Sequence, residues 1–168
     1  LWCARLTNYE SGFLVLKGKL SELLTASKID VRQEIGAVPE VCVAESEFGA
    51  DDLYVEKRKW ITIDDALVVV ADLKNSTKLG VNRRASSTAR IYQASTGNVA
   101  KIFDSFEADY LGIQGDGVFA IFWGENRVSR ALCAGVTIKT FSLDLVDQLE
   151  SKWNSLPETG LKVGVASG

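Results

Sequence analysis

Two long apolar runs, each beside an aspartate, form the strongest pattern along the chain. The first run ends on Asp72 and lies in the stretch 61–73. The second surrounds Asp116, which has a glycine on each side and apolar residues at 108–114 and 118–123. Nearly continuous apolar runs of this length are typical of buried strands, and Gly-Asp-Gly between two of them is typical of a tight hairpin turn. The pattern therefore predicts a strand that ends on the first aspartate and a hairpin with the second at its tip.

Three other stretches have apolar residues at every third or fourth position, which predicts amphipathic helices. The first covers residues 1–28, and a weakly patterned connecting arm with one or two short strands follows over 29–60. The second helix is expected at about 79–106, where Gly97 could break it, and the third at about 127–153. The apolar side of the third helix is predicted to include Val128, Leu132, Val136, Val146, Leu149 and Trp153.

A last strand begins at residue 161 and completes the order strand, helix, strand, strand, helix, strand. This is the order of the split βαβ, ferredoxin-like arrangement, an α+β fold with both helices on one face of an antiparallel-containing sheet. We therefore expect a globular domain at 61–168, preceded by an N-terminal helix and connecting arm at 1–60.

Composition and charge argue against several classes of protein. The chain has 46% hydrophobic and 24% charged residues and a net charge of −3, which argues against a dedicated nucleic-acid surface. No apolar run approaches the roughly 18 residues that a membrane span needs. The start shows no signal-peptide pattern, and the three cysteines are scattered. These features predict a cytoplasmic protein with reduced thiols.

Two residue types are absent. The chain has no histidine, so acid–base or metal chemistry must rest on carboxylates, lysines, water or the substrate. It also has no methionine, even at position 1. This indicates either an internal piece of a longer protein or a written sequence from which methionines were lost, and in the second case the spacings are shortened.

Asp72 and Asp116 are the candidate metal ligands. In the predicted topology their strands are neighbours, so both carboxylates should meet at one edge of the sheet. Oxygen ligands of this kind suit Mg²⁺ or Mn²⁺ bound together with substrate phosphates. Asn75, Ser76 and Thr77 would start a helix there, and helix N-termini bind phosphate. The alternative is structural, with Asp116 as a turn residue and Asp72 as a helix cap, but both would then fall at matching strand ends by chance.

Three motifs resemble those of the class III nucleotidyl cyclases, the adenylate and guanylate cyclases. The first is a strand that ends on Asp72, before a turn closed by serine and threonine. The second is Gly-Asp-Gly around Asp116, followed by an apolar strand. The third, at 161–168, is similar to the strand that precedes the last catalytic segment of that family. The resemblance covers residues 61–168.

The resemblance implies a nucleotidyl cyclase catalytic domain at 61–168 whose C-terminal part, with the transition-state Asn and Arg, is missing after Gly168. It implies that Asp72 and Asp116, assisted by the Leu73 carbonyl, hold Mg²⁺ or Mn²⁺, and that residues 75–77 cradle the phosphates. The 3′-hydroxyl of a nucleoside triphosphate would attack the α-phosphorus, giving a 3′,5′-cyclic nucleotide and pyrophosphate. The family works as a head-to-tail homodimer with active sites at the interface.

The base-binding positions depart from those of adenylate cyclases. Those enzymes carry an adenine-reading lysine four residues before the second aspartate, where this chain has Gly112. Gln114 is then the nearest polar side chain on the same strand face. Cyclases of the bacterial anti-phage Pycsar systems, which make cyclic UMP or CMP, also lack the ordinary purine-reading set. The resemblance therefore implies a non-adenine product, with UTP or CTP ahead of GTP, and a role in antiviral defence.

Three other functions stay open at this point. One is an ordinary adenylate or guanylate cyclase. Another is a catalytically inactive cyclase-homology module for regulation or dimerisation, because the segment after Gly168 is missing. The third is a relative of diguanylate cyclases or polymerase palm domains, against which Asp116 is followed by Gly117 rather than by an acid.

Overall fold

The computed structural model describes residues 3–44, 48–52 and 58–168, and its description of side chains begins at residue 17. The chain divides into two compact units. One contains Leu1–Cys42 and Val55–Trp60, and the other contains Val43–Tyr54 and Ile61–Gly168. The parts of the predicted connecting arm at 45–47 and 53–57 lie outside the described residues.

The first unit is built around one long helix, α1 (Cys3–Gly36). The helix continues past the predicted end at residue 28, because residues 29–35 contain no glycine or proline, and it ends at Gly36, shortly before Pro39. Its described apolar side chains, among them Leu20 and Ile35, are exposed. Within the described ranges, no helix is both long and apolar enough to cross a membrane.

Two short strands, β1 (Glu40–Val43) and β2 (Lys59–Thr62), pair in a two-stranded sheet, which confirms the short strands predicted for the arm. A 3-10 turn, η1, covers Ala50–Asp52. β2 and β3 (Leu67–Leu73) are separate strands, whereas the sequence predicted one strand over 61–73. Asp65 between them has a φ of 58°, a left-handed conformation that aspartate adopts in turns and that ends a strand.

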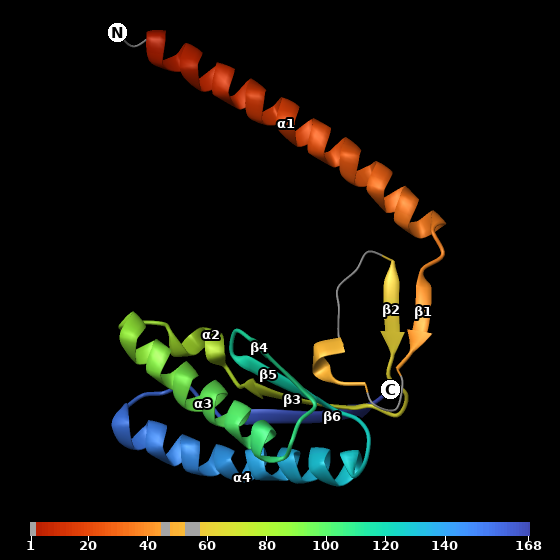
Figure 1. Cartoon of the computed structure of the whole chain (residues 1–168). Coiled ribbons are helices and arrows are strands. Elements are labelled where there is room, and N and C mark those ends of the chain that lie inside the picture. Colours follow the sequence, from red (N-terminus) through yellow and green to blue (C-terminus); the bar gives the residue numbers. More distant parts are fainter. Residues whose placement is uncertain (1–2, 45–47, 53–57) are drawn as a thin grey trace. The chain divides into compact units, whose positions relative to one another are not determined.

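The second unit contains a four-stranded sheet of β3, β4 (Tyr110–Gln114), β5 (Gly117–Phe122) and β6 (Leu161–Ser167). The strand order is β4-β5-β3-β6, and each neighbouring pair is antiparallel. Two helices, α3 (Ala85–Ser105) and α4 (Arg127–Lys152), lie side by side against one face of this sheet (Figure 1). The predicted ferredoxin-like α+β fold is confirmed.

The long helix after β3 begins later than predicted. A one-turn helix, α2 (Ser76–Leu79), comes first, and α3 starts only at Ala85. Gly80 follows the short helix and Asn82 has a φ of 58°, so the chain turns before α3 begins. α3 then runs unbroken through Gly97, because core packing on its apolar side outweighs the roughly 1 kcal/mol that a helical glycine costs.

Strand alternation builds the core between the sheet and the helices. From Val69 onward, every second residue of β3 is at most 1% exposed, and so is every second residue of β5 from Val118; these residues are Val69, Ala71, Leu73, Val118, Ala120 and Phe122. The residues between them point to the opposite face, which none of the described α-helices of this unit covers (Figure 1). We call this second face the open face of the sheet.

The predicted apolar side of α4 is wrong over the first half of the helix. Val128, Leu132 and Val136 are 50%, 50% and 67% exposed. The buried residues are smaller, and Ala134 and Gly135 are among them. A Cβ at Gly135 would lie 3.6 Å from a valine methyl of β6, so the helix approaches the sheet too closely for large side chains there.

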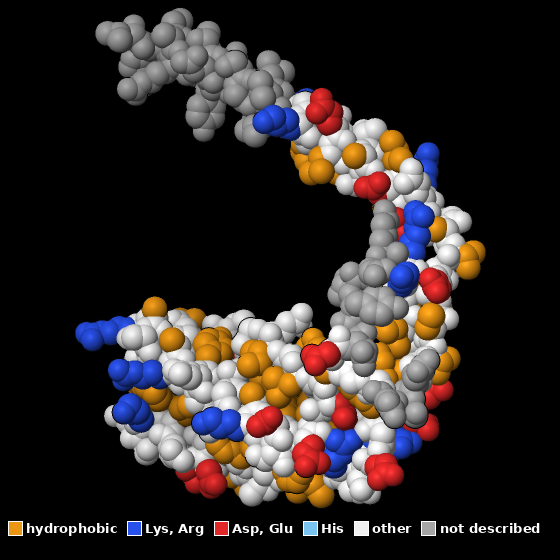
Figure 2. All heavy atoms as spheres, in the orientation of Figure 1, with side chains coloured by type: hydrophobic (Ala, Val, Ile, Leu, Met, Phe, Trp, Pro, Cys, Tyr) orange, Lys and Arg blue, Asp and Glu red, His pale blue; other side chains and the backbone are white. Residues whose placement is uncertain are grey.

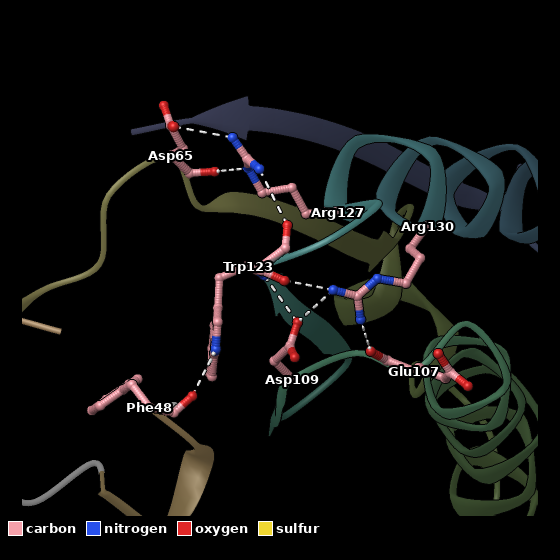
Figure 3. Close-up of polar contacts among 8 residues, drawn as sticks. Phe48, Asp65, Glu107, Asp109, Trp123, Arg127 and Arg130 are labelled. Carbon is pink, nitrogen blue, oxygen red and sulfur yellow. Dashed lines mark hydrogen bonds and ion pairs between the residues drawn. The ribbon is translucent and has the colours of Figure 1, made fainter. Parts of the chain in front are cut away.

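Arg130 of α4 fixes the end of the β4–β5 hairpin that lies away from Asp116 (Figure 3). Its guanidinium donates to the Asp109 carboxylate at 3.1 Å, to the Trp123 carbonyl at 2.5 Å and to the Glu107 carbonyl. The Trp123 backbone N–H donates to the same Asp109 oxygen at 2.9 Å. Because these residues stand just before β4 and just after β5, the contacts hold the two strand ends together.

Candidate active site

Asp72 and Asp116 lie at neighbouring strand ends on one end of the sheet, because β3 and β5 are adjacent strands, as the sequence predicts. Asp72 stands directly opposite Gly117, the first residue of β5, and Asp116 immediately precedes that glycine. A Cβ at Gly117 would lie 3.7 Å from Asp72 Oδ1. Both aspartates are half-buried. The antiparallel pairing of β3 with β5 therefore brings two aspartates that are far apart in the sequence to neighbouring backbone positions.

The hairpin turn consists of Gly115 and Asp116, between the paired residues Gln114 and Gly117. Gly115 has a φ of 63°, and Asp116 is not among the residues with positive φ. A two-residue loop with positive φ at its first position only is the pattern of a type II′ turn, which favours glycine there. The turn thus fixes the position of Asp116 at the end of the sheet.

Four residues form a row across the open face at this end. From β4 to β6 they are Gln114, Gly117, Asp72 and Lys162, and we call them the polar row. Residues directly opposite each other on antiparallel strands share a face, with Cβ atoms about 5 Å apart. Lys162, which is exposed, therefore extends on the same face as Asp72. Lys162 was not among the predicted site residues, because the sequence does not show which residue of β3 it pairs with.

The turn after β3 is tied to the loop before β6. Lys74 forms an ion pair with Glu158, and the Asn75 side-chain amide donates to the Glu158 carbonyl at 2.6 Å. The Thr159 hydroxyl donates to the Lys74 carbonyl at 3.2 Å. The Lys74 ammonium donates a hydrogen bond to the exposed Glu158 carboxyl and attracts its charge, and so lowers its pKa. These contacts were not predicted, and they orient the segment that follows Asp72.

Asn75, Ser76 and Thr77, the predicted phosphate-binding residues, lie in this segment. Asn75 has a φ of 58° at the start of α2, and its amide is engaged with the loop before β6. The Tyr92 hydroxyl of α3 donates to the Ser76 carbonyl at 3.3 Å. The segment is therefore held from two sides next to the carboxylates, and its contact with phosphate stays a prediction.

Cationic side chains gather at the end of the unit where α3 begins and α4 ends (Figure 2). The chain between β3 and the middle of α3 contains Lys74, Lys78, Arg83, Arg84 and Arg90. Arg83 donates to the Ser155 carbonyl at 3.0 Å, and Lys74 pairs with Glu158, so these two also have structural partners. Positive charge near two carboxylates favours the approach of a polyanion with its counter-cation.

Gly112 and Gln114, predicted to face the base, lie on the open face of β4. Gln114 is exposed and belongs to the polar row. Gly112 stands opposite Phe119, and a Cβ at position 112 would lie 2.5 Å from two ring atoms of that phenylalanine. The ring therefore takes the space that a side chain at position 112 would use. Contact of Gly112 and Gln114 with a base stays a prediction.

The residues at the carboxylate end fit a divalent hard cation. Asp72 and Asp116 offer carboxylate oxygens from adjacent segments, and Gly117 leaves the space beside Asp72 free of a side chain. Leu73 is buried, and since its side chain has no ligand atom, only its backbone carbonyl could contribute. Across the described residues, no group of three or more His, Cys, Asp or Glu side chains stands together. Further ligands for Mg²⁺ or Mn²⁺ would then be substrate phosphates and water.

Comparison with curated proteins finds two relatives of high identity, both named uridylate cyclase. The one from Micromonospora echinofusca is 54% identical over 149 residues, covering 88% of this chain and 49% of the relative. The one from Propioniciclava tarda is 46% identical over 123 residues, covering 72% of this chain and 40% of the relative. The chain thus spans less than half the length of each. No family model matches the chain.

Solved structures of cyclases share the fold. The adenylyl cyclase CyaB from P. aeruginosa superposes with a TM-score of 0.56 at 16% identity, over 62% of this chain and 56% of that one. The guanylyl cyclase Cya2 gives a TM-score of 0.54 at 16% identity, over 62% and 54%. The sequence identity to cyclases and the shared fold agree with the three motifs. Over the aligned residues, the chain is therefore related to proteins named uridylate cyclase, and it shares the fold of adenylyl and guanylyl cyclase domains.

Proposed function

We propose that the protein to which this chain belongs is a uridylate cyclase, which converts UTP to 3′,5′-cyclic UMP and pyrophosphate. The observation that carries the reaction is the position of Asp72 opposite Gly117, directly beside Asp116, at the end of β3 and β5. The preference for UTP rests on relatives of 54% and 46% identity that are named uridylate cyclase. Gly112 supports it, because this position lacks a side chain that could read a purine.

In this proposal, Asp72 and Asp116 hold Mg²⁺ or Mn²⁺ with help from the Leu73 carbonyl. The bound cation would supply charge neutralisation at the triphosphate and activation of the attacking hydroxyl. Lys162 extends beside Asp72 in the polar row, where an ammonium would attract phosphate oxygens. Residues 75–77 would orient the β- and γ-phosphates from the other side of the carboxylates.

The reaction forms one bond and breaks one. The ribose 3′-oxygen attacks the α-phosphorus, the bond from that phosphorus to the bridging oxygen breaks, and pyrophosphate leaves with the electron pair. Within this chain and its substrate, the groups that can accept the hydroxyl proton are a site carboxylate, a substrate phosphate or water. Most of the catalysis would then come from positioning and charge, as is general for phosphoryl transfer.

We also propose that the active sites form in a homodimer and that the cyclic nucleotide serves antiviral signalling. Exposure of Val70, at 44%, supports the first proposal, because this residue lies in the middle of a central strand on the open face. Contact with a second copy would cover this apolar side chain and remove its surface from water. The second proposal rests on the resemblance to Pycsar cyclases.

The test is a product assay on the full-length protein. It is incubated with UTP, CTP, ATP or GTP and Mn²⁺, and the cyclic products are identified by mass. We expect cyclic UMP from the native protein and none from Asp72→Asn. Dominant cyclic AMP or GMP would make the protein an ordinary purine cyclase, and no product from any of the four would favour an inactive cyclase-homology module.

A further inference from the structure

The open face becomes uncharged two residues along each strand from the polar row. The next row across the four strands consists of Gly112, Phe119, Val70 and Gly164. It lies about 7 Å along the strands from the carboxylates, because each strand residue advances roughly 3.3 Å. This second row carries no charge and one aromatic ring. A nucleotide whose phosphates lie on the polar row needs an adjoining surface for its nucleoside, and this row offers one.

The ring of Phe119 is the main feature of that surface. It lies over Gly112, because a Cβ built on Gly112 would be 2.5 Å from both Cε1 and Cζ of the phenylalanine. Real Cβ atoms essentially never come so close to other heavy atoms, so the ring and a side chain at position 112 exclude each other. The Tyr110 ring stands beside it, with centroids 6.0 Å apart. The ring position is therefore defined by a glycine on one side and an aromatic neighbour on another.

The rest of the second row leaves space next to the ring. Gly164 has nothing within 4 Å of the place where its Cβ would be, and Val70 is 44% exposed. Phe119 itself is only half-buried. A flat, partly exposed ring beside a shallow apolar floor suits stacking or edge contact with a nucleobase, which contributes about 1 to 3 kcal/mol per base.

We propose that Phe119 is a specificity-determining residue of the cyclase, and this rests on the proposed function. Its ring, seated over Gly112, bounds the space for the base and leaves room for one ring rather than two. The glycine is needed because any side chain at position 112 would push the phenylalanine out of this place. Selectivity for a pyrimidine then has two sources: the Phe119 ring fills the volume that a second base ring would need, and Gly112 offers no polar side chain to a purine.

The test compares kcat/KM for UTP, CTP, ATP and GTP in full-length variants. Phe119→Ala is expected to raise the purine-to-pyrimidine ratio of kcat/KM about tenfold or more, because a difference in size within an apolar pocket discriminates substrates by roughly 10- to 200-fold. Phe119→Leu should give a smaller rise. Gly112→Ala should lower kcat/KM for UTP, because its methyl displaces the ring. In Gly112→Ala/Phe119→Ala the methyl has no ring to displace, so the double variant should be no worse than Phe119→Ala alone.

Ile121→Ala is the matched control, since Ile121 lies on the same strand and face as Phe119 but one row further from the carboxylates. It should leave the ratio unchanged. Equal changes for all four nucleotides in Phe119→Ala and Phe119→Leu, or strictly additive effects of the two single alanine variants, would overturn the proposal. Nucleotide dissociation constants are measured alongside turnover. If the native protein turns over none of the four nucleotides, the proposed function is wrong. The role of Phe119 is then still tested by comparing the ratio of the UTP and ATP dissociation constants in the native protein and in Phe119→Ala.

Discussion

Replacement of Arg130 by methionine should destabilise the domain without changing the chemistry. Methionine keeps most of the apolar stem but loses the guanidinium. The Arg130 side chain is 18% exposed and that of Asp109 is 26% exposed, so the ion pair is half-buried. The guanidinium pairs with Asp109 at 3.1 Å, donates to two backbone carbonyls and lies 5.7 Å from the centre of the Phe122 ring. Its loss leaves a carboxylate and two carbonyls short of a donor.

The expected cost is about 2 kcal/mol, below the roughly 3 to 5 kcal/mol for breaking a fully buried ion pair, because both side chains are partly exposed and the Asp109 carboxylate keeps the bond from the Trp123 N–H. The assay is urea unfolding of the full-length protein, followed by tryptophan fluorescence. With a slope of about 2 kcal/mol per molar urea, the midpoint should fall by roughly 1 M. Arg90→Met, at an exposed position on α3, should change it little. A loss below about 1 kcal/mol in Arg130→Met would refute the view that this cluster holds the hairpin ends together.

Three further predictions concern the site. Lys162→Ala should raise KM for the nucleotide about tenfold with little effect on folding, since it removes one charge-assisted phosphate contact; an unchanged KM would remove Lys162 from the site. Gly115→Ala should cost about 1 to 2 kcal/mol in thermal unfolding and lower activity, because its φ of 63° disfavours any side chain; equal stability would contradict the turn assignment. Pairing with Lys74 lowers the pKa of Glu158 in the folded state, so its contribution to stability is present above the ordinary glutamate pKa and is lost as pH falls through the lowered value. Glu158→Gln should therefore flatten the acid side of a plot of unfolding free energy against pH. A plot that still matches that of the native protein would show that the pair contributes nothing.

Much of the fold follows from local patterns in the sequence. The apolar runs beside Asp72 and Asp116 predict strands that the structure contains, and the order of elements predicts the sheet with its two helices on one face. The inward side of α4 could not be predicted in this way. Where α4 lies closest to the sheet, there is room for Ala134 and Gly135 but not for larger apolar side chains. The sequence does not show where the helix comes this close.

The candidate site also contains residues that the sequence reveals and residues that it does not. The two aspartates are visible in the sequence because strands disfavour this residue and each one ends an apolar run. Lys162 and Phe119 are not visible, because their neighbours are set by strand register. Lys162 is placed by its pairing with Asp72, and Phe119 by its pairing with Gly112. The tie between Lys74 and Glu158 joins two loops far apart in the chain, and no periodicity predicts it.

The central claim is that Asp72 and Asp116 together hold one divalent-cation site. Mn²⁺ binding to the full-length protein, measured by electron paramagnetic resonance with a non-reactive UTP analogue present, tests it most directly. Asp144, exposed on α4, supplies the matched control Asp144→Asn, which should bind Mn²⁺ as the native protein does. Asp72→Asn and Asp116→Asn should each weaken Mn²⁺ binding at least about tenfold, because each removes one of two carboxylate ligands. Native Mn²⁺ affinity in either aspartate variant would contradict the claim.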